Sequence, residues 1–145
     1  MSLEGWLRNG WLARHQASPR EVAALLAAAA DDLANAEKDL SAGWRFAIAY
    51  NAALRLSSVA LSAAGYRAAR EQKHYRSIAA LPLLLGPEVR ELAEFLDRCR
   101  TRRHEVTYEL VSTVSQGEAD ELVNAVRELQ SRVGEWLRAN HPGLL

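Results

Sequence analysis

The stretch from Leu96 to Glu109 concentrates side chains of one chemistry. Four arginines fall within six residues, Arg98, Arg100, Arg102 and Arg103, and His104 and Tyr108 follow them. On a straight helix Arg100, His104 and Tyr108 are four residues apart and share one face, so a guanidinium, an imidazole and a phenol come within reach of one ligand. Because arginine binds phosphate and carboxylate groups through a planar fork of donors, the cluster predicts a binding site for an anion.

Arg103 stands out within this cluster because of the residues that precede it. Val89, Leu92, Leu96 and Cys99 recur at steps of three and four, which is typical of the core-facing side of an amphipathic helix. The same line continues to Arg103. An arginine there is costly unless a carboxylate, a phosphate or a partner chain meets it. The alternative is that its stem packs while its head reaches solvent.

Length and composition indicate one domain over residues 1–145, with enough apolar residues for a core. The net charge is zero, so the protein as a whole lacks the basic character of many proteins that bind nucleic acids or membranes. The sequence also lacks a run of eighteen apolar residues and the pattern of a signal peptide. We therefore expect a cytoplasmic protein that does not enter a membrane.

Few other chemistries are supported by motifs. The single cysteine, Cys99, excludes an internal disulfide and a cysteine-based zinc site. Four histidines stand far apart in the sequence: His15, His74, His104 and His141. No phosphate-binding glycine loop, HExxH motif or nucleophile elbow is present. We expect no metal and no cofactor.

Apolar periodicity and helix-start signals predict an all-α protein. Ser18-Pro19-Arg20-Glu21 and Ser115-Gln116-Gly117-Glu118 both resemble helix starts, and no window shows the two-residue alternation of a strand. The result is an up-and-down bundle of about five or six helices. The expected helices cover residues 4–15, 18–40, 44–64, 77–85, 87–108 and 115–140, with residues 44–64 as the central helix.

A polar line runs along the expected central helix. It consists of Asn51, Arg55, Ser58 and Ser62, at steps of four, three and four. Such a line either faces solvent or flanks a site, and the sequence leaves both interpretations open.

The order of these features resembles the HEPN superfamily over nearly the whole chain. The alanine-rich helix that contains Tyr50 and ends at Gly65 is similar to a helix of that family, and Lys73-His74-Tyr75 resembles its histidine before the next helix. Arg103-His104 resembles the start of the family signature, an arginine, a polar residue and then a histidine four to six residues after the arginine. The resemblance implies an all-α fold and a minimal nucleotidyltransferase as partner.

The match to this signature departs from the family pattern. Aligning Arg103 with the family arginine puts His104 at the polar position and Tyr108 at the histidine position. In members that cleave RNA, the resemblance implies metal-independent attack of the ribose 2′-hydroxyl on the phosphate, with the histidine moving protons. A tyrosine with a pKa of about 10 is a poor base, so this alignment implies weak or lost nuclease activity. A second alignment pairs Arg98 with His104 and has Cys99 at the polar position. We favour the first.

Three functions follow as hypotheses. The first is a HEPN-like homodimer that binds RNA or a nucleotide at a shared cleft, with a nucleotidyltransferase partner in a toxin–antitoxin-type system. Its phosphate-binding residues would be Arg98, Arg100, Arg102 and Arg103, with His104 and Tyr108 beside them. The second is a metal-independent endoribonuclease toxin that uses Arg103 or Arg98 with His104. The third is a structural helical module whose arginines only bridge carboxylates such as Glu94, Asp97 and Glu105.

Overall fold

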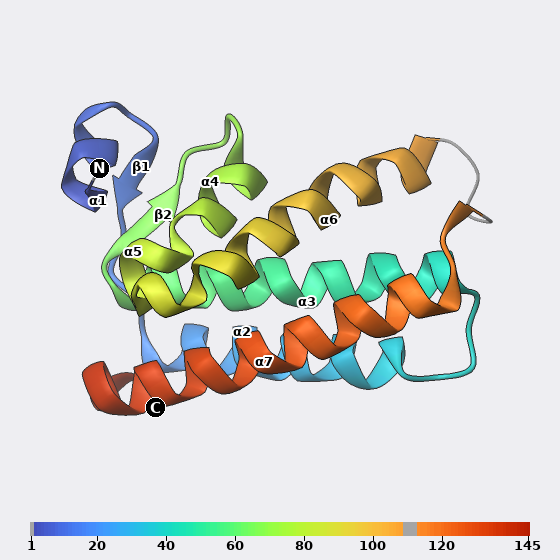
Figure 1. Ribbon diagram of the computed structural model, residues 1–145. Coiled ribbons are helices and arrows are strands. Elements are labelled where there is room, and N and C mark those ends of the chain that lie inside the picture. The colour runs from blue at the N-terminus through green and yellow to red at the C-terminus, as the bar shows by residue number, and fades with distance from the viewer. Residues whose placement is uncertain (1, 109–112) are drawn as a thin grey trace.

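The computed structural model describes the backbone of residues 2–108 and 113–145 and the side chains of residues 2–103 and 113–145. Within these residues the all-α prediction is confirmed, because helices form the body of the molecule (Figure 1). The elements in order are α1 (Leu3–Arg8), β1 (Leu12–Arg14), α2 (Pro19–Ala36), α3 (Ala42–Ala63), β2 (Tyr66–Ala68), α4 (Lys73–Ala79), α5 (Leu81–Leu85), the 3-10 turn η1 (Pro87–Val89), α6 (Arg90–Tyr108), α7 (Gln116–Asn140) and the 3-10 turn η3 (Pro142–Leu144).

The central helix is α3, as predicted. It packs against α2 and α7 on one side and against α4 and α6 on the other (Figure 1). Phe46, Tyr50, Leu56 and Val59 of α3 all lie in the main core. By length and composition α3 could cross a membrane, but 61% of its apolar window is buried inside the bundle, which is the position of a core helix.

The two predicted helix starts are confirmed. The hydroxyl of Ser18 accepts a hydrogen bond from the backbone N–H of Glu21 at 3.1 Å. Ser115 accepts one from the N–H of Glu118 at 3.0 Å, and the carboxylate of Glu118 accepts one from the N–H of Ser115 at 3.2 Å. Both caps satisfy backbone donors that have no partner inside the helix.

The prediction of a helix over residues 4–15 and of no strands is wrong in part. Helix α1 ends at Arg8, Gly10 has φ +77°, and β1 then pairs antiparallel with β2 in the register Leu12 to Ala68. Each strand has three residues, too few to show an alternating pattern. The two strands are also joined by two helices rather than by a hairpin turn. The sequence therefore contains no local pattern that predicts these two strands.

The helix predicted over residues 77–85 is also corrected. Helix α4 begins at Lys73, after Gln72 with φ 55°, and Pro82 stands in the first turn of α5 rather than interrupting one helix. The first turn of α4 is exposed, so it carries no apolar periodicity that the sequence could reveal. The earlier start places His74 and Tyr75 on a helix that packs against α6.

Candidate functional site

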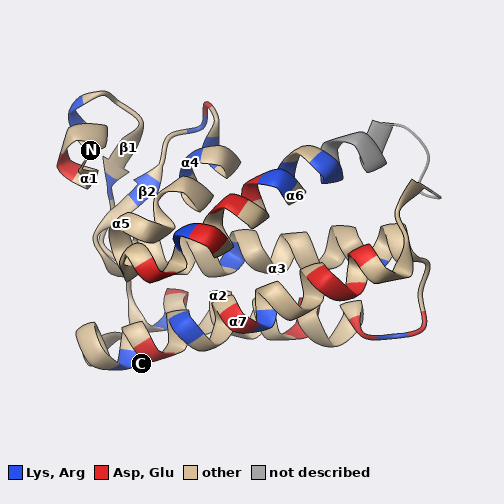
Figure 2. Cartoon of the chain, in the orientation of Figure 1, with Lys and Arg blue, Asp and Glu red and all other residues tan. Residues whose placement is uncertain are grey.

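The arginine-bearing helix α6 crosses the bundle beside α4 and above α3 (Figure 1). Along α6 the acidic side chains come before most of the basic ones (Figure 2). The predicted apolar stripe is confirmed, since Val89, Leu96 and Cys99 are buried and Leu92 packs partly against the core. This stripe fixes which faces of α6 its arginines occupy.

Arg103 continues the stripe, as expected, and its side chain is half-buried. Its guanidinium carbon lies 5.5 Å from the centroid of the Tyr50 ring on α3. A cation over an aromatic face is attracted by the negative charge of the π system. The arginine head is thus directed onto the central helix.

Tyr50 lies beneath this arginine. Only 1% of its surface is exposed, and its hydroxyl has no hydrogen-bond partner in the described part of the chain. Burial raises the pKa of Tyr50 to about 12, although Arg100 and Arg103 act in the opposite direction. The ring of His74, on α4, lies edge-on to it with 6.3 Å between the centroids. Tyr50 is therefore a protonated donor between an arginine and a histidine.

Arg100 lies on the same side of α6. Its guanidinium carbon is 5.4 Å from the centroid of the Tyr75 ring, and its Nε donates to Oδ1 of Asp97 at 2.8 Å. A shallow depression of about 430 Å³ opens here, lined by Arg70, Gln72, Lys73, His74, Tyr75 and Arg100. We call it the cationic depression. Partial desolvation beside Tyr50, together with the charges of Arg103, Lys73 and Arg100, lowers the pKa of His74, which favours its neutral imidazole.

Arg102 faces the other way. Its Nε donates to Oε2 of Glu118 at 3.1 Å, and its Nη2 donates to the carbonyl of Thr113 at 2.5 Å. The hydrogen bond from Arg102 lowers the pKa of Glu118. Since Glu118 also caps α7, Arg102 links α6 to the start of α7.

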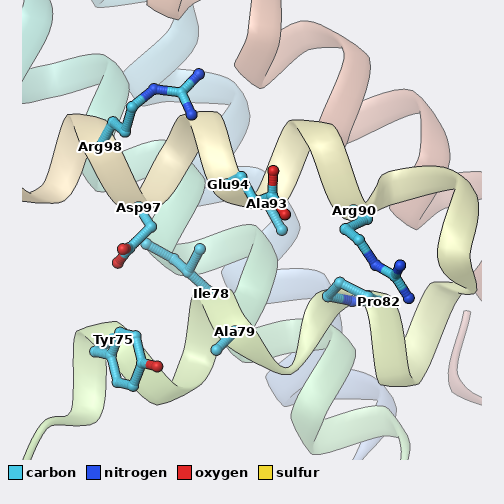
Figure 3. Close-up of a pocket in the computed structure, with 9 residues that line it drawn as sticks. All are labelled: Tyr75, Ile78, Ala79, Pro82, Arg90, Ala93, Glu94, Asp97 and Arg98. Carbon is cyan, nitrogen blue, oxygen red and sulfur yellow. The ribbon is translucent and has the colours of Figure 1, made fainter.

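Arg98 shares the side of Arg102, one turn earlier. It is exposed and its guanidinium carbon lies 5.7 Å from the Phe95 ring centroid. Figure 3 shows it pointing away from Tyr75 and Asp97. Helix geometry explains the division, because residues three or four apart share a face whereas Arg98 and Arg100 are separated by about 200° around the axis. The four arginines thus form two pairs, and one pair, Arg100 and Arg103, faces α3 and α4.

A groove of about 510 Å³ adjoins the cationic depression at Tyr75, which lines both. Its floor is apolar and comes from α4, α5 and α6, while carboxylates stand at its edge (Figure 3). The floor residues are Ile78, Ala79, Pro82 and Ala93. The edge consists of the carboxylates of Glu94 and Asp97 and the guanidinium groups of Arg90 and Arg98. An apolar floor next to a cationic surface fits a planar ring attached to a phosphate.

The remaining expected site residues, His104 and Tyr108, lie outside the residues whose side chains the structure describes. The sequence analysis did not name Arg70 as a site residue. It used Tyr50 and Lys73-His74-Tyr75 only as features of the family resemblance and did not place them in the site. The basic and aromatic composition of residues 70–76 was a signal for them. Their approach to Arg100 and Arg103 depends on how α4 packs against α6, which no local pattern reveals.

Metal and thiol chemistry find little support here. Among the residues whose side chains are described, no group of three or more histidine, cysteine, aspartate or glutamate side chains could hold a metal ion. Burial raises the pKa of Cys99 to about 12, so its thiol is not a nucleophile at neutral pH. Arginine, lysine, histidine and tyrosine supply the chemistry of this surface.

The fold is a helical bundle in which one helix carries a cluster of arginines. A comparison with known protein families identifies the family that has this fold. Residues 34–134, well over half of the chain, match the SAV_6107-like HEPN family. The chain belongs to the HEPN family. The match includes α3, α4 and α6, and it leaves α1, β1 and most of α2 outside. No curated protein and no solved structure matches the chain.

Proposed function

We propose that this HEPN protein binds single-stranded RNA or a nucleotide on the surface formed by α4 and α6. The observation that carries the proposal is the meeting of side chains from three helices. Arg103 lies 5.5 Å and His74 6.3 Å from the Tyr50 ring, and Arg100 lies 5.4 Å from the Tyr75 ring. Arginine and lysine bind phosphates, and exposed aromatic rings stack on unpaired bases.

Charge supports the same proposal. Arg70 and Lys73 line the cationic depression and form no ion pair within the described part of the chain. No carboxylate is among the described residues that line the depression, and Asp97, beside it on α6, accepts a hydrogen bond from Arg100. The depression therefore keeps a positive potential that attracts phosphate. Tyr75 is 40% exposed, so its ring is accessible to a base in the adjoining groove.

The proposal includes a homodimer, a partner and a cellular location. Two copies of α6 would pair across a cleft, so that Arg100 and Arg103 of both protomers face one strand of RNA. Membership of the HEPN family supports a minimal nucleotidyltransferase, in a toxin–antitoxin-type system, as the partner protein. We place the pair in the cytoplasm, with nuclease activity weak or lost because Tyr108 stands where the family signature has histidine.

Salt dependence of RNA binding tests the proposal. Each phosphate contact made by a single strand contributes a slope of about 0.7 to the fall of log affinity with log salt. If Arg100, Arg103 and Lys73 each contact a phosphate, raising the salt from about 50 to about 200 mM should weaken wild-type binding about 18-fold. In Arg100→Gln with Arg103→Gln, one contact remains, and the same rise in salt should weaken binding only about 2.6-fold. Fluorescence anisotropy with a labelled single-stranded RNA measures both values.

Two control variants separate binding from structure. Arg132→Gln removes one positive charge, half of the change in the double variant, from an exposed ion pair on α7 and should leave the salt dependence unchanged. Arg102→Gln removes the link to Glu118 and should lower the melting temperature without changing RNA affinity. If Arg100→Gln with Arg103→Gln lowers the melting temperature and the wild type binds no RNA or nucleotide, the arginines are scaffold, and the protein is a structural module.

One observation favours the alternative, a metal-independent endoribonuclease. The lowered pKa of His74 leaves an imidazole able to accept a proton at neutral pH, and it shares the Tyr50 ring with Arg103. His74 would take the proton of a 2′-hydroxyl as its oxygen attacks the adjacent phosphate, and Arg103 would stabilise the phosphorane. The bond from phosphorus to the 5′-oxygen then breaks, and this leaving oxygen takes up a proton from water. RNA cleavage in the presence of a chelator, abolished by His74→Ala, would establish this function.

A further inference from the structure

A third cavity lies between the N-terminal segment and the helical body. Its volume is about 260 Å³, below the range of about 300–1,000 Å³ that is typical of sites for drug-sized ligands. It lies where the end of β1 and the start of α2 meet α3, β2 and α4. Its polar lining residues are His15, Glu21, Ser58, Ser62, Arg67, Lys73 and Ser77, and its apolar ones are Leu25, Leu61 and Ala68.

One wall of this cavity is a hydrogen-bonded unit. Nε2 of His15 lies 2.8 Å from both carboxylate oxygens of Glu21, and the hydroxyl of Ser62 donates to Oε2 of Glu21 at 3.3 Å. Because an ionised carboxylate only accepts, Nε2 of His15 is the donor. The backbone N–H of His15 in turn donates to the carbonyl of Gly65 at 2.9 Å. Glu21, the one carboxylate among the lining residues, is thus engaged in holding the wall together.

Among the other polar lining residues, the hydroxyl of Ser77 donates to the carbonyl of Lys73, whereas three side chains lack such a bond within the described part of the chain. Arg67 and Lys73 form no ion pair, and the hydroxyl of Ser58 forms no hydrogen bond, with any described residue. The lining thus contains two cations and one carboxylate, and that carboxylate already has two donors, His15 and Ser62. The cavity therefore has a positive potential toward its mouth and an apolar surface at Leu25 and Leu61.

We propose that this cavity binds a small organic anion. A carboxylate or phosphate group would be held by Arg67, Lys73 and the hydroxyl of Ser58, and a short hydrocarbon part would lie against Leu25 and Leu61. Guanidinium and ammonium groups bind both kinds of oxyanion. The polar line of α3 thereby divides into two parts, since Arg55 forms a surface ion pair with Asp32 whereas Ser58 and Ser62 flank this cavity.

His15 and Glu21 lie outside the part of the chain that matches the HEPN family. The site thus depends on the N-terminal segment of this protein as well as on its helical body. It is also independent of the proposed RNA surface, apart from Lys73, which lines both cavities. For this reason the test relies on Arg67 and Ser58, which line only this cavity among those described.

Calorimetric titration of the full chain tests the site with three probes: inorganic phosphate, glycerol 3-phosphate and butyrate. The proposal expects saturable one-to-one binding of glycerol 3-phosphate or butyrate, and the stronger of the two identifies the preferred head group. Inorganic phosphate should bind more weakly, because it makes no contact with Leu25 and Leu61. At about one hundred times the dissociation constant, the ligand should raise the melting temperature by about 5–10 °C.

Two variants and one matched control decide the outcome. Arg67→Gln removes one cation and Ser58→Leu fills the cavity, and each should weaken binding at least about tenfold, which corresponds to about 1.4 kcal/mol. Arg14→Gln removes a charge from the neighbouring strand, where Arg14 pairs with Glu4, and should bind like the wild type. The site is refuted if neither organic probe saturates, or if both variants unfold cooperatively at the wild-type temperature and still bind with wild-type affinity.

Discussion

Replacing Tyr50 with phenylalanine should stabilise the protein, against the usual direction of core substitutions. The hydroxyl is buried and has no hydrogen-bond partner in the described part of the chain, so folding removes it from water without compensation. Such a group costs about 1–3 kcal/mol. Phenylalanine keeps the ring that Arg103 and His74 contact. We expect the free energy of unfolding to rise by about 1 kcal/mol, and the melting temperature by about 2–4 °C.

Urea denaturation followed by circular dichroism measures this change, with an unchanged m-value as the sign that only stability differs. Tyr66→Phe is the matched control, because the hydroxyl of Tyr66 donates to Glu4 and its loss should not stabilise the protein. A destabilised Tyr50→Phe would show that the hydroxyl does have a partner, such as a buried water, and would refute the reasoning. If RNA affinity falls while stability rises, the hydroxyl is kept for binding at the expense of stability.

Three further predictions follow. Light scattering at micromolar concentration should give about 32 kDa, twice the 16.1 kDa of one chain, and a strict monomer would contradict the shared cleft. Partial desolvation and neighbouring cations lower the pKa of His74, so as the pH falls the unfolded chain binds a proton at His74 before the folded chain does. Stability should therefore be lost as the pH falls from about 6.5 through the folded pKa, and His74→Gln should reduce that loss. Tyr108→His restores the Arg103-x4-His spacing and should raise RNA cleavage by up to about 10²–10⁴-fold. Wild-type cleavage with a chelator present, abolished by His104→Ala, would instead establish the Arg98 alignment.

The parts of the fold that the sequence predicted correctly are those with local signals. The caps at Ser18 and Ser115 form as expected because a cap needs only residues within one turn. The apolar line through Leu96 and Cys99 lies in the core as expected, because a period of 3.6 residues fixes one face of a helix. The family resemblance, which combined several such local features, is confirmed by the match over residues 34–134.

The parts that it missed depend on contacts between distant segments. Strand β1 exists only because β2 lies beside it, and the sequence of three residues cannot specify that partner. The first turn of α4 is polar and exposed, yet it brings His74 next to Tyr50. The His15, Glu21 and Ser62 unit likewise joins three segments. Each of these features is a contact between segments that are distant in the sequence, and the candidate sites consist largely of such contacts.

The sequence shows that the four arginines are clustered, but their distribution around α6 follows only from the geometry of the helix. Four arginines in six residues look like one group, but their spacing separates them into pairs on opposite sides of α6. Arg102 is bound to Glu118 and Thr113, so part of the cluster is needed to attach α6 to α7. Arg100 and Arg103 face α3 and α4, where Tyr50, Lys73 and His74 add a phenol, an ammonium and an imidazole. Because the imidazole of His74 comes from α4, the departure from the family signature at Tyr108 does not by itself remove a histidine from the arginine surface. The two proposed functions, RNA binding alone and RNA cleavage, are therefore distinguished by His74 as much as by α6.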